Sequence, residues 1–273
     1  MNSVAEPLAL HEHEADLERR FGGLRRLYGE ADYLRLRALR VAVVGLGGVG
    51  SWTTEALARS GVAELVLIDL DHVAESNINR QVQASTATLG MSKVQALAQR
   101  IEGIHPACVV RAVEEFVAAD NWPALLPVAV DAVVDACDQG AAKLALAAWA
   151  LAAGVPLICV GAAGGKRQPQ LVQVADLAET THDPVLASLR QRLRKQHGAP
   201  RSGAIGLRCV YSREAITRPE AACAADENPR IDSNLNCHGY GSSVTVTATF
   251  GLVAAAQAID LALAGLGRAK TTV

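Results

Sequence analysis

The chain has 273 residues, of which 50% are hydrophobic and 20% are charged, enough to build the core of one large α/β domain or two small ones. The formal net charge of −2 gives no overall attraction to nucleic acid or to an anionic membrane, so a polyanionic partner would need a local basic patch. The 6 cysteines form no CxxC pair, which argues against a cysteine-rich zinc site and favours a reducing, cytoplasmic compartment over a disulfide framework.

Helices and strands are predicted to alternate after a flexible acidic tail at residues 1–18. The stretch 19–39, which glycines interrupt, predicts two short helices. Further on we expect strands at 41–44, 64–68, 108–113, 132–136 and 156–160, and helices at 51–59, 92–102, 122–126 and 141–153. Strands that alternate with helices form parallel sheets with right-handed crossovers. The order therefore predicts a Rossmann-like α/β fold, a doubly wound, mostly parallel sheet with helices on both faces.

The pattern changes after Gly161. We expect an antiparallel strand at 170–174 that extends the sheet, a basic helix at 184–196, a strand at 208–211, a loop at 219–236 and a closing helix at 244–264. Residues 19–273 would then form a single domain with a basic part at about 166–241. The uncharged stretch 242–259 is shorter than the ~20 residues of a membrane span, so we expect a buried helix and no membrane association.

A glycine motif follows the first predicted strand. Gly45, Gly47 and Gly50, with Gly48 between them, form G-x-G-x-x-G. These glycines permit a tight turn, a close backbone approach to phosphate and close packing of helix on strand. Asp69 ends the next strand, where a carboxylate can accept hydrogen bonds from ribose hydroxyls. The alternatives are a turn without a ligand and a plain strand-end acid. The motif indicates an adenine-nucleotide site and by itself still allows a nicotinamide dehydrogenase.

The segment after Asp69 separates these enzyme classes. It contains Asp71, Asn77, Arg80, Gln81 and Lys93. Arginine matches phosphate oxygens in bidentate fashion and lysine acts as a point charge, so these residues suit a polyphosphate. Hydride transfer needs no such clamp, whereas nucleotidyl transfer does, because charge spreads onto the leaving pyrophosphate. An ordinary solvated loop is the alternative.

Asp138 follows the predicted strand 132–136. Ligands of open α/β sheets bind outside the carboxyl ends of the strands, so this carboxylate is expected in the same crevice. It could hold Mg²⁺ on the phosphates, cap the helix at 141–153, or do both.

Together these motifs resemble the ubiquitin-activating-enzyme-like adenylation family. The matching residues are GLGGVGS at 45–51, Asp69 with Asp71, S-N-x-N-R-Q at 76–81, G-x-x-K at 90–93 and D-A-x-D at 135–138. The resemblance covers residues 19–165 and implies ATP and Mg²⁺ as cofactors. It implies Asp69 on the ribose, Asn77, Arg80 and Lys93 on the phosphates, and Asp138 on the magnesium. Family members attack the α-phosphate of ATP with a carboxylate and form an acyl-adenylate and pyrophosphate.

Members of this family often form dimers in which an arginine on one subunit's N-terminal helix reaches the partner's site. That position falls here on Gly23, three residues after Arg20, which departs from the pattern. The resemblance leaves Arg20 and Arg26 as substitute candidates and a homodimer as the expected assembly.

Two further segments point to one branch of the family. R-F-G-G-L-x-R-L-Y-G at 20–29 and V-T-A-T-F-G at 246–251 resemble the family's tRNA dehydratases, and the CxxC zinc pairs typical of sulfur-carrier activators are absent from the sequence. The resemblance implies an AMP-forming enzyme that adenylates a threonyl carboxylate on a modified adenosine beside the anticodon. The adjacent ureido group would then close a ring, with net loss of water. An activator of a ubiquitin-like sulfur carrier and a sulfur-relay adaptor are the alternatives.

Positive charge gathers in one part of the chain and favours tRNA as a partner. The predicted patch consists of Arg190, Arg192, Arg194, Lys195, Arg201 and Arg208, with Lys166 and Arg167 nearby. Such cations would contact phosphates and position tRNA without reading its sequence. A solvated helix face is the alternative.

Cys237 lies beside His238, which could lower the pKa of the thiol and favour the thiolate. Cys237 is therefore a candidate for a covalent or sulfur-accepting role, with a sulfur-relay protein as its partner. A plain loop cysteine is the alternative, and cyclisation of an adenylate requires no protein thiol.

Overall fold

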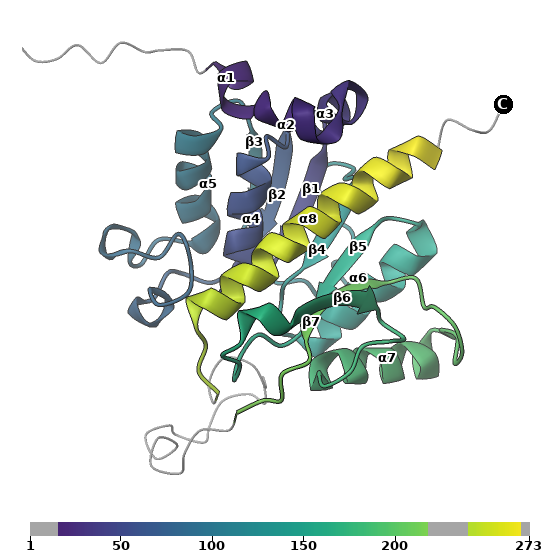
Figure 1. Cartoon of the computed structure of the whole chain (residues 1–273). Helices are drawn as coiled ribbons and strands as arrows, with labels where there is room; N and C mark the ends of the chain where they lie inside the picture. The colour runs from purple at the N-terminus through teal and green to yellow at the C-terminus, as the bar shows by residue number, and fades with distance from the viewer. Residues whose placement is uncertain (1–15, 218–239, 269–273) are drawn as a thin grey trace, which may run out of the picture.

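A seven-stranded sheet lies at the centre of the computed structural model, which describes residues 16–217 and 240–268 (Figure 1). The strand order is β3-β2-β1-β4-β5-β7-β6. The strands are β1 (Arg40–Val44), β2 (Glu64–Ile68), β3 (Val109–Val113), β4 (Ala132–Asp135), β5 (Leu157–Val160), β6 (Val172–Asp176) and β7 (Arg208–Ser212). All neighbours pair in parallel except β6 and β7, which are antiparallel with Val174 opposite Val210. This confirms the predicted doubly wound sheet.

The order of the strands reverses between β1 and β4. The chain moves outward from β1 to β2 and β3, then returns to β4 on the other side of β1. The loops that leave β1 and β4 therefore diverge to opposite sides, and a crevice opens between them at the carboxyl ends of the strands.

Helices cover both faces of the sheet. They are α1 (Leu17–Phe21), α2 (Gly23–Tyr28), α3 (Glu30–Leu36), α4 (Gly50–Arg59), α5 (Lys93–Ile104), α6 (Gly140–Ala153), α7 (Pro184–Gln196) and α8 (Val244–Arg268). Val41 and Val43 of β1 face a core that includes residues of α4, α5 and α8. Ala42 and Val44 face the other core, which includes residues of α6 and α7. Because successive side chains of a strand point to opposite faces, β1 is buried on both sides.

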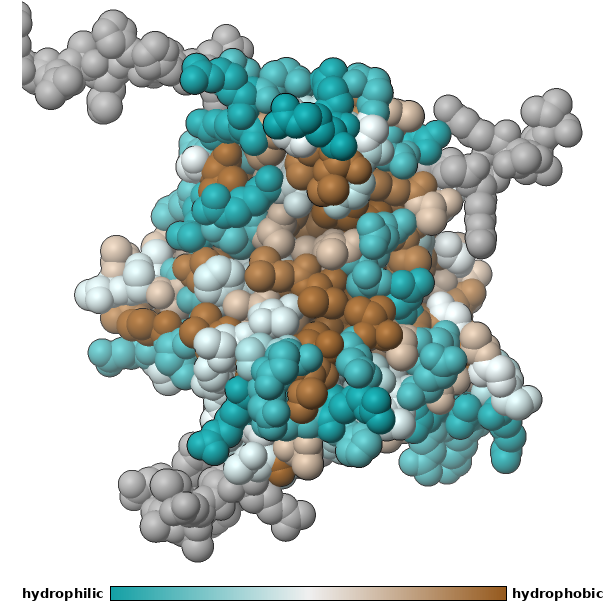
Figure 2. Space-filling model, in the orientation of Figure 1, coloured by the Kyte–Doolittle hydropathy of each residue, from teal (hydrophilic) through white to brown (hydrophobic). Residues whose placement is uncertain are grey.

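Helix α8 crosses one face of the sheet diagonally (Figure 1). Its segment Val244–Gly265 is long and apolar enough to cross a bilayer, a property shared by core helices of soluble proteins, and 56% of its most apolar window is buried inside the protein. Gly251 permits close packing on α4, since a Cβ there would lie 2.6 Å from the Val49 carbonyl oxygen. Figure 2 shows apolar residues gathered over the middle of this face. On α8, Leu252 is 51% exposed.

Three details differ from the sequence prediction. The stretch 19–39 contains three short helices because the chain breaks at Gly22 as well as at Gly29, and α1 already begins at Leu17 because Asp16 caps it. The predicted helix at 122–126 is wrong: residues 119–125 form turns. The Leu125 N–H donates to Asn121 O and the Leu126 N–H donates to Pro123 O, so single turns form here without a continuous helical hydrogen-bond pattern.

His105 ends α5 and contacts Phe21 and Arg37 of the N-terminal segment. Its Nε2 lies 3.1 Å from Arg37 Nη1. Because a guanidinium only donates, Nε2 accepts and carries no proton. Burial and the charge of Arg37 lower the pKa of His105 from 6.5 to about 4.

Acid should therefore begin to destabilise the protein as the pH falls below about 6.5, the ordinary pKa of histidine. Between about pH 6.5 and 4 the unfolded chain binds a proton at His105 that the folded chain does not. The stability tied to neutral His105 is complete above this window and is lost as the pH falls through it. We expect the urea midpoint of His105→Gln to vary less over this range than that of the wild type. Parallel pH profiles for the two proteins would refute this assignment.

Candidate nucleotide-binding site

A cavity of about 460 Å³ lies at the carboxyl ends of the central strands, where the strand order reverses. This size falls within the range of small-molecule sites. Ten residues singled out in the sequence line it together: Gly45, Gly47, Gly48, Asp69, Asp71, Asn77, Arg80, Gln81, Lys93 and Asp138. They come from the loops after β1, β2 and β4 and from the start of α5, so only the folded sheet brings them together.

The remaining candidates lie elsewhere. Gly50 lies behind the cavity wall, where any Cβ would collide with the Gly45 carbonyl oxygen, so it serves the close packing of α4 on β1. Arg20 donates through Nη1 to the carbonyl oxygen of Ile104 at 2.6 Å, at the far end of α5 from Lys93. Within one chain it does not reach the cavity. Cys237 lies outside the described residues.

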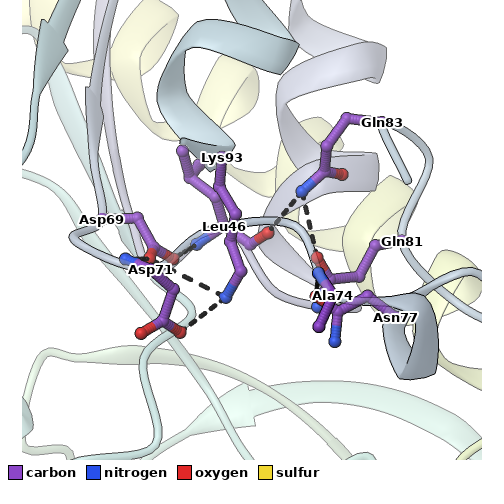
Figure 3. Close-up of polar contacts among 8 residues, drawn as sticks. All are labelled: Leu46, Asp69, Asp71, Ala74, Asn77, Gln81, Gln83 and Lys93. Atoms are coloured by element: carbon purple, nitrogen blue, oxygen red, sulfur yellow. Dashed lines mark hydrogen bonds and ion pairs between the residues drawn. The ribbon is translucent and has the colours of Figure 1, made fainter. Parts of the chain in front are cut away.

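The glycine loop is held by hydrogen bonds at Leu46. The Leu46 N–H donates to Asp69 Oδ2 at 2.6 Å, and the Leu46 carbonyl oxygen accepts from Gln83 Nε2 at 3.0 Å (Figure 3). Gly45 has a φ of +84°, and a Cβ there would lie 2.8 Å from the Cys137 nitrogen. Glycine at this position therefore allows the loop after β1 to pass directly against the loop after β4.

Two carboxylates and one ammonium form the floor of the site (Figure 3). Lys93 Nζ lies 2.6 Å from Asp71 Oδ2 and 3.8 Å from Asp69 Oδ1. Burial raises the pKa of Asp69, although Lys93 and the N–H groups of Leu46 and Asp71 oppose this shift. The Asp71 side chain is 55% exposed. Water can therefore solvate this carboxylate if Lys93 leaves it to pair with a polyphosphate.

Asn77 ends the turn η1 (Glu75–Asn77), and Arg80 lies in the turn that follows it. Asn77 Oδ1 accepts from the Ala74 N–H at 3.0 Å, which leaves its amide N–H groups as donors for the cavity. The stem of Arg80 lies over the glycine loop, 3.3 Å from the Cβ position of Gly48. Its Nη1 donates to Ser76 O and to Asn79 Oδ1. The Arg80 guanidinium therefore lies beside the glycine loop, which lines the cavity.

Asp138 is half-buried in the cavity wall and carries no hydrogen bond or ion pair within the described ranges. It is not the cap of α6: the N-cap is Gln139, which makes no side-chain capping bond. The capping interpretation of Asp138 is therefore wrong. Residues 16–217 and 240–268 contain no cluster of three potential metal-ligating side chains. A magnesium ion here would need oxygen atoms of the bound nucleotide as well as Asp138, which is how Mg²⁺ usually binds.

A buried ion pair below Asp138 was missed in the sequence. Lys143 Nζ lies 3.1 Å from Asp135 Oδ1 and donates to Val160 O at 2.8 Å, and both side chains are at most 2% exposed. Burial opposes the charged form of Lys143, but Asp135 outweighs it and raises the pKa of the lysine. The pair ties the end of β4 to the end of β5, where the cavity-lining segment 161–164 begins. The sequence did contain a sign of this ion pair: Lys143 is a single lysine in an apolar helix, eight residues after Asp135 at the end of a strand.

The residues of the predicted basic patch lie on two different faces of the sheet. Arg190, Arg192 and Arg194 lie on α7 and donate to backbone carbonyl oxygens. Arg208 lies on the other face of the sheet, where it donates to Gln257 of α8. Lys166 is 2% exposed and donates to Ser212 O and Glu214 O, so it is not a surface cation. The cations on the α7 side are Arg190, Arg192, Arg194, Lys195 and Arg201.

The fold and this cavity define the class of protein. The chain belongs to the ThiF family, whose model matches residues 21–272. It is 40% identical to the tRNA threonylcarbamoyladenosine dehydratase of Escherichia coli, over 91% of this chain and 95% of that protein. The enzyme of the same name from Haemophilus influenzae is 37% identical, over 89% and 93%. The solved structure of the E. coli enzyme in complex with ATP superposes with a TM-score of 0.82 at 38% identity, covering 93% of this chain and 98% of that one.

Proposed function

We propose that this chain is an ATP-dependent tRNA threonylcarbamoyladenosine dehydratase. The observation that carries the proposal is the match in fold and sequence over nearly the full length of a dehydratase that binds ATP. The cavity supports it, because glycine-loop amides, a guanidinium and an ammonium converge where a polyphosphate would lie. A sulfur-carrier activator is disfavoured, since these near full-length relatives act on tRNA by name.

In this proposal each cavity residue has a role that its position suits. Asp69 accepts hydrogen bonds from the ribose, as the acid after the second strand does in this type of nucleotide site. Asn77, Arg80 and Lys93 hold the phosphates. Asp138 would hold Mg²⁺, which would supply positive charge beside the phosphate oxygens.

The chemistry proceeds in two displacements. A carboxylate oxygen of the threonyl group bonds to the α-phosphorus of ATP, and the bond from that phosphorus to the β-phosphate oxygen breaks. Arg80 and Lys93 stabilise the charge on the leaving pyrophosphate. An atom of the ureido group then bonds to the acyl carbon and loses its proton, while AMP departs with the former carboxylate oxygen. No protein thiol takes part, so Cys237 is not required.

Mass analysis of modified nucleosides tests the proposal directly. Purified protein is incubated with ATP and tRNA that carries threonylcarbamoyladenosine, and the tRNA is then digested. The expected product is lighter by the mass of one water and forms together with AMP. Pyrophosphate release that depends on a carrier protein and not on tRNA would refute this function in favour of a sulfur-carrier activator.

We propose that tRNA binds on the α7 side of the molecule. Five cations gather there in a chain of net charge −2. If about five phosphates are contacted, tRNA affinity should fall about 100-fold or more between roughly 50 and 200 mM salt. Lys195→Gln, which removes an exposed cation, should reduce the slope of log affinity against log salt by about one. A salt-independent affinity would exclude this surface.

We further propose a homodimer in which Arg20 of one subunit serves the cavity of the other. Two features support it: Arg20 does not reach its own cavity, and apolar side chains are exposed on α2, α3 and α8, including Leu27, Leu34 and Leu252. Light scattering that gave the mass of one chain at micromolar concentration would count against the dimer.

A further inference from the structure

Gln83 lies two residues beyond the S-N-x-N-R-Q motif and has no role in the mechanism above. Its side chain is 3% exposed and lies between the glycine loop and Gln81 (Figure 3). Gln83 Nε2 donates to Leu46 O at 3.0 Å and to Gln81 Oε1 at 3.1 Å. One amide group therefore contacts two different parts of the cavity wall.

The orientation of both amides follows from the Leu46 carbonyl. A backbone carbonyl oxygen only accepts, so the Gln83 atom that faces it must be the Nε2 donor. The second N–H of that group points to Gln81, so the Gln81 atom that faces it must be the acceptor Oε1. The donating Nε2 end of Gln81 is then left for the cavity, which Gln81 lines. Without Gln83, nothing in this network distinguishes the two ends of the Gln81 amide.

The same contact fixes the glycine loop. The Leu46 N–H is bound by Asp69 and its carbonyl oxygen by Gln83, so the peptide groups on both sides of Leu46 are held. The next residues, Gly47 and Gly48, line the cavity. Gln83 Oε1 is buried without a partner among the described residues, and an unsatisfied buried acceptor is costly. The gain at this position therefore lies in the two hydrogen bonds that the amide donates.

We infer that Gln83 is the positioning residue for the phosphate end of the cavity. It holds the glycine loop open to phosphate and turns the Gln81 amide so that donors face the phosphate oxygens. The inference rests on the proposed function, since ATP is the ligand. It predicts an effect that is largest for the phosphates, because the two contacts hold the glycine loop and Gln81, which suit a polyphosphate.

The test compares direct binding of ATP and of adenosine by calorimetry. Gln83→Glu has nearly the same shape, and its ionised carboxylate offers only acceptors, so in that form it repels Leu46 O and favours the reversed Gln81 amide. We expect the Kd for ATP to rise at least about tenfold, the scale expected when a buried hydrogen-bonding group loses its partner. The Kd for adenosine should stay within about twofold. Gln170→Glu, which adds the same charge at an exposed site, is the matched control.

A second variant removes the need for a charge change. Gln83→Met deletes both hydrogen bonds. If Gln83 acts partly through Gln81, this substitution should raise the Kd for ATP less in a Gln81→Met background than in the wild type, because substitutions at coupled residues are not additive. ATP binding within twofold of wild type in both Gln83 variants would overturn the inference. Equal losses for ATP and adenosine would also overturn it, since they would mean general damage to the site. Failure of the wild type to bind ATP would instead refute the proposed function.

Discussion

Arg80→Ala should lower ATP-dependent adenylation of the tRNA carboxylate at least about 100-fold, the scale expected when a donor that stabilises transition-state charge is removed. The Arg80 side chain lies beside the glycine loop. The backbone carbonyl oxygen of Arg80 accepts a hydrogen bond from Trp52 Nε1 at 3.0 Å. Truncation should therefore remove charge without moving the turn that carries it. The measurement is the initial rate of tRNA-dependent pyrophosphate release.

Two further variants make this result specific. Arg80→Lys keeps the charge but loses the bidentate geometry, so its rate should lie between those of wild type and Arg80→Ala. Arg111→Ala removes an arginine of the edge strand β3 that pairs with Glu64 at 2.7 Å, and it should retain the wild-type rate. If Arg80→Ala turned over within a few-fold of wild type, Arg80 would not belong to the reacting site.

Lys143→Met should reduce the free energy of unfolding by about 3–5 kcal/mol, the usual cost of leaving a buried charge without its partner. Asp135 is fully buried, and its Oδ2 has no hydrogen-bond partner in the part of the chain that the structure describes. Loss of the ammonium would therefore leave this carboxylate with little compensation. Urea titration monitored by circular dichroism measures the effect.

The paired variant Lys143→Met/Asp135→Asn should recover most of this stability. The asparagine is neutral, and its oxygen can still accept from the Cys137 N–H as Asp135 Oδ1 does at 3.3 Å. Lys195→Met, at an exposed site on α7, should change the free energy of unfolding by less than about 0.5 kcal/mol. A double variant as unstable as Lys143→Met alone would show that charge balance is not what this pair provides.

Local patterns in the chain were sufficient to predict most of the fold. The strands β1 and β2 and the helices α4 and α7 lie within a residue of their predicted bounds, because apolar runs and caps are encoded locally. The helix expected at 122–126 is wrong because these residues form separate hydrogen-bonded turns, which do not continue into a helix. The antiparallel strand begins at Val172, two residues late, because residues 169–171 form a short turn first.

The lining of the cavity was predictable where a motif carries a complete chemical requirement, as at Gly45, Arg80 and Lys93. It was not predictable where a residue acts through a partner distant in sequence. Gln83 is unremarkable until Leu46 is placed 3.0 Å away across 37 residues. Lys143 likewise reads as an interruption of an apolar helix until Asp135 and Val160 are packed around it. Arg208 appeared to share a surface with α7 because the sequence gives no face for a strand residue until its neighbours are known.

The packing of α8 on α4 determines when during folding this protein can first bind a nucleotide. Thr53 Oγ1 on the helix that follows the glycine loop donates to Gly251 O at 3.1 Å, across 198 residues of chain. Ser242 and Thr247, at the start of α8, complete the cavity wall. Contacts between such remote segments form late, since loop closure must come first. Nucleotide affinity should therefore appear only at the end of refolding. The binding of a fluorescent ATP analogue would then report the time at which α8 packs on α4.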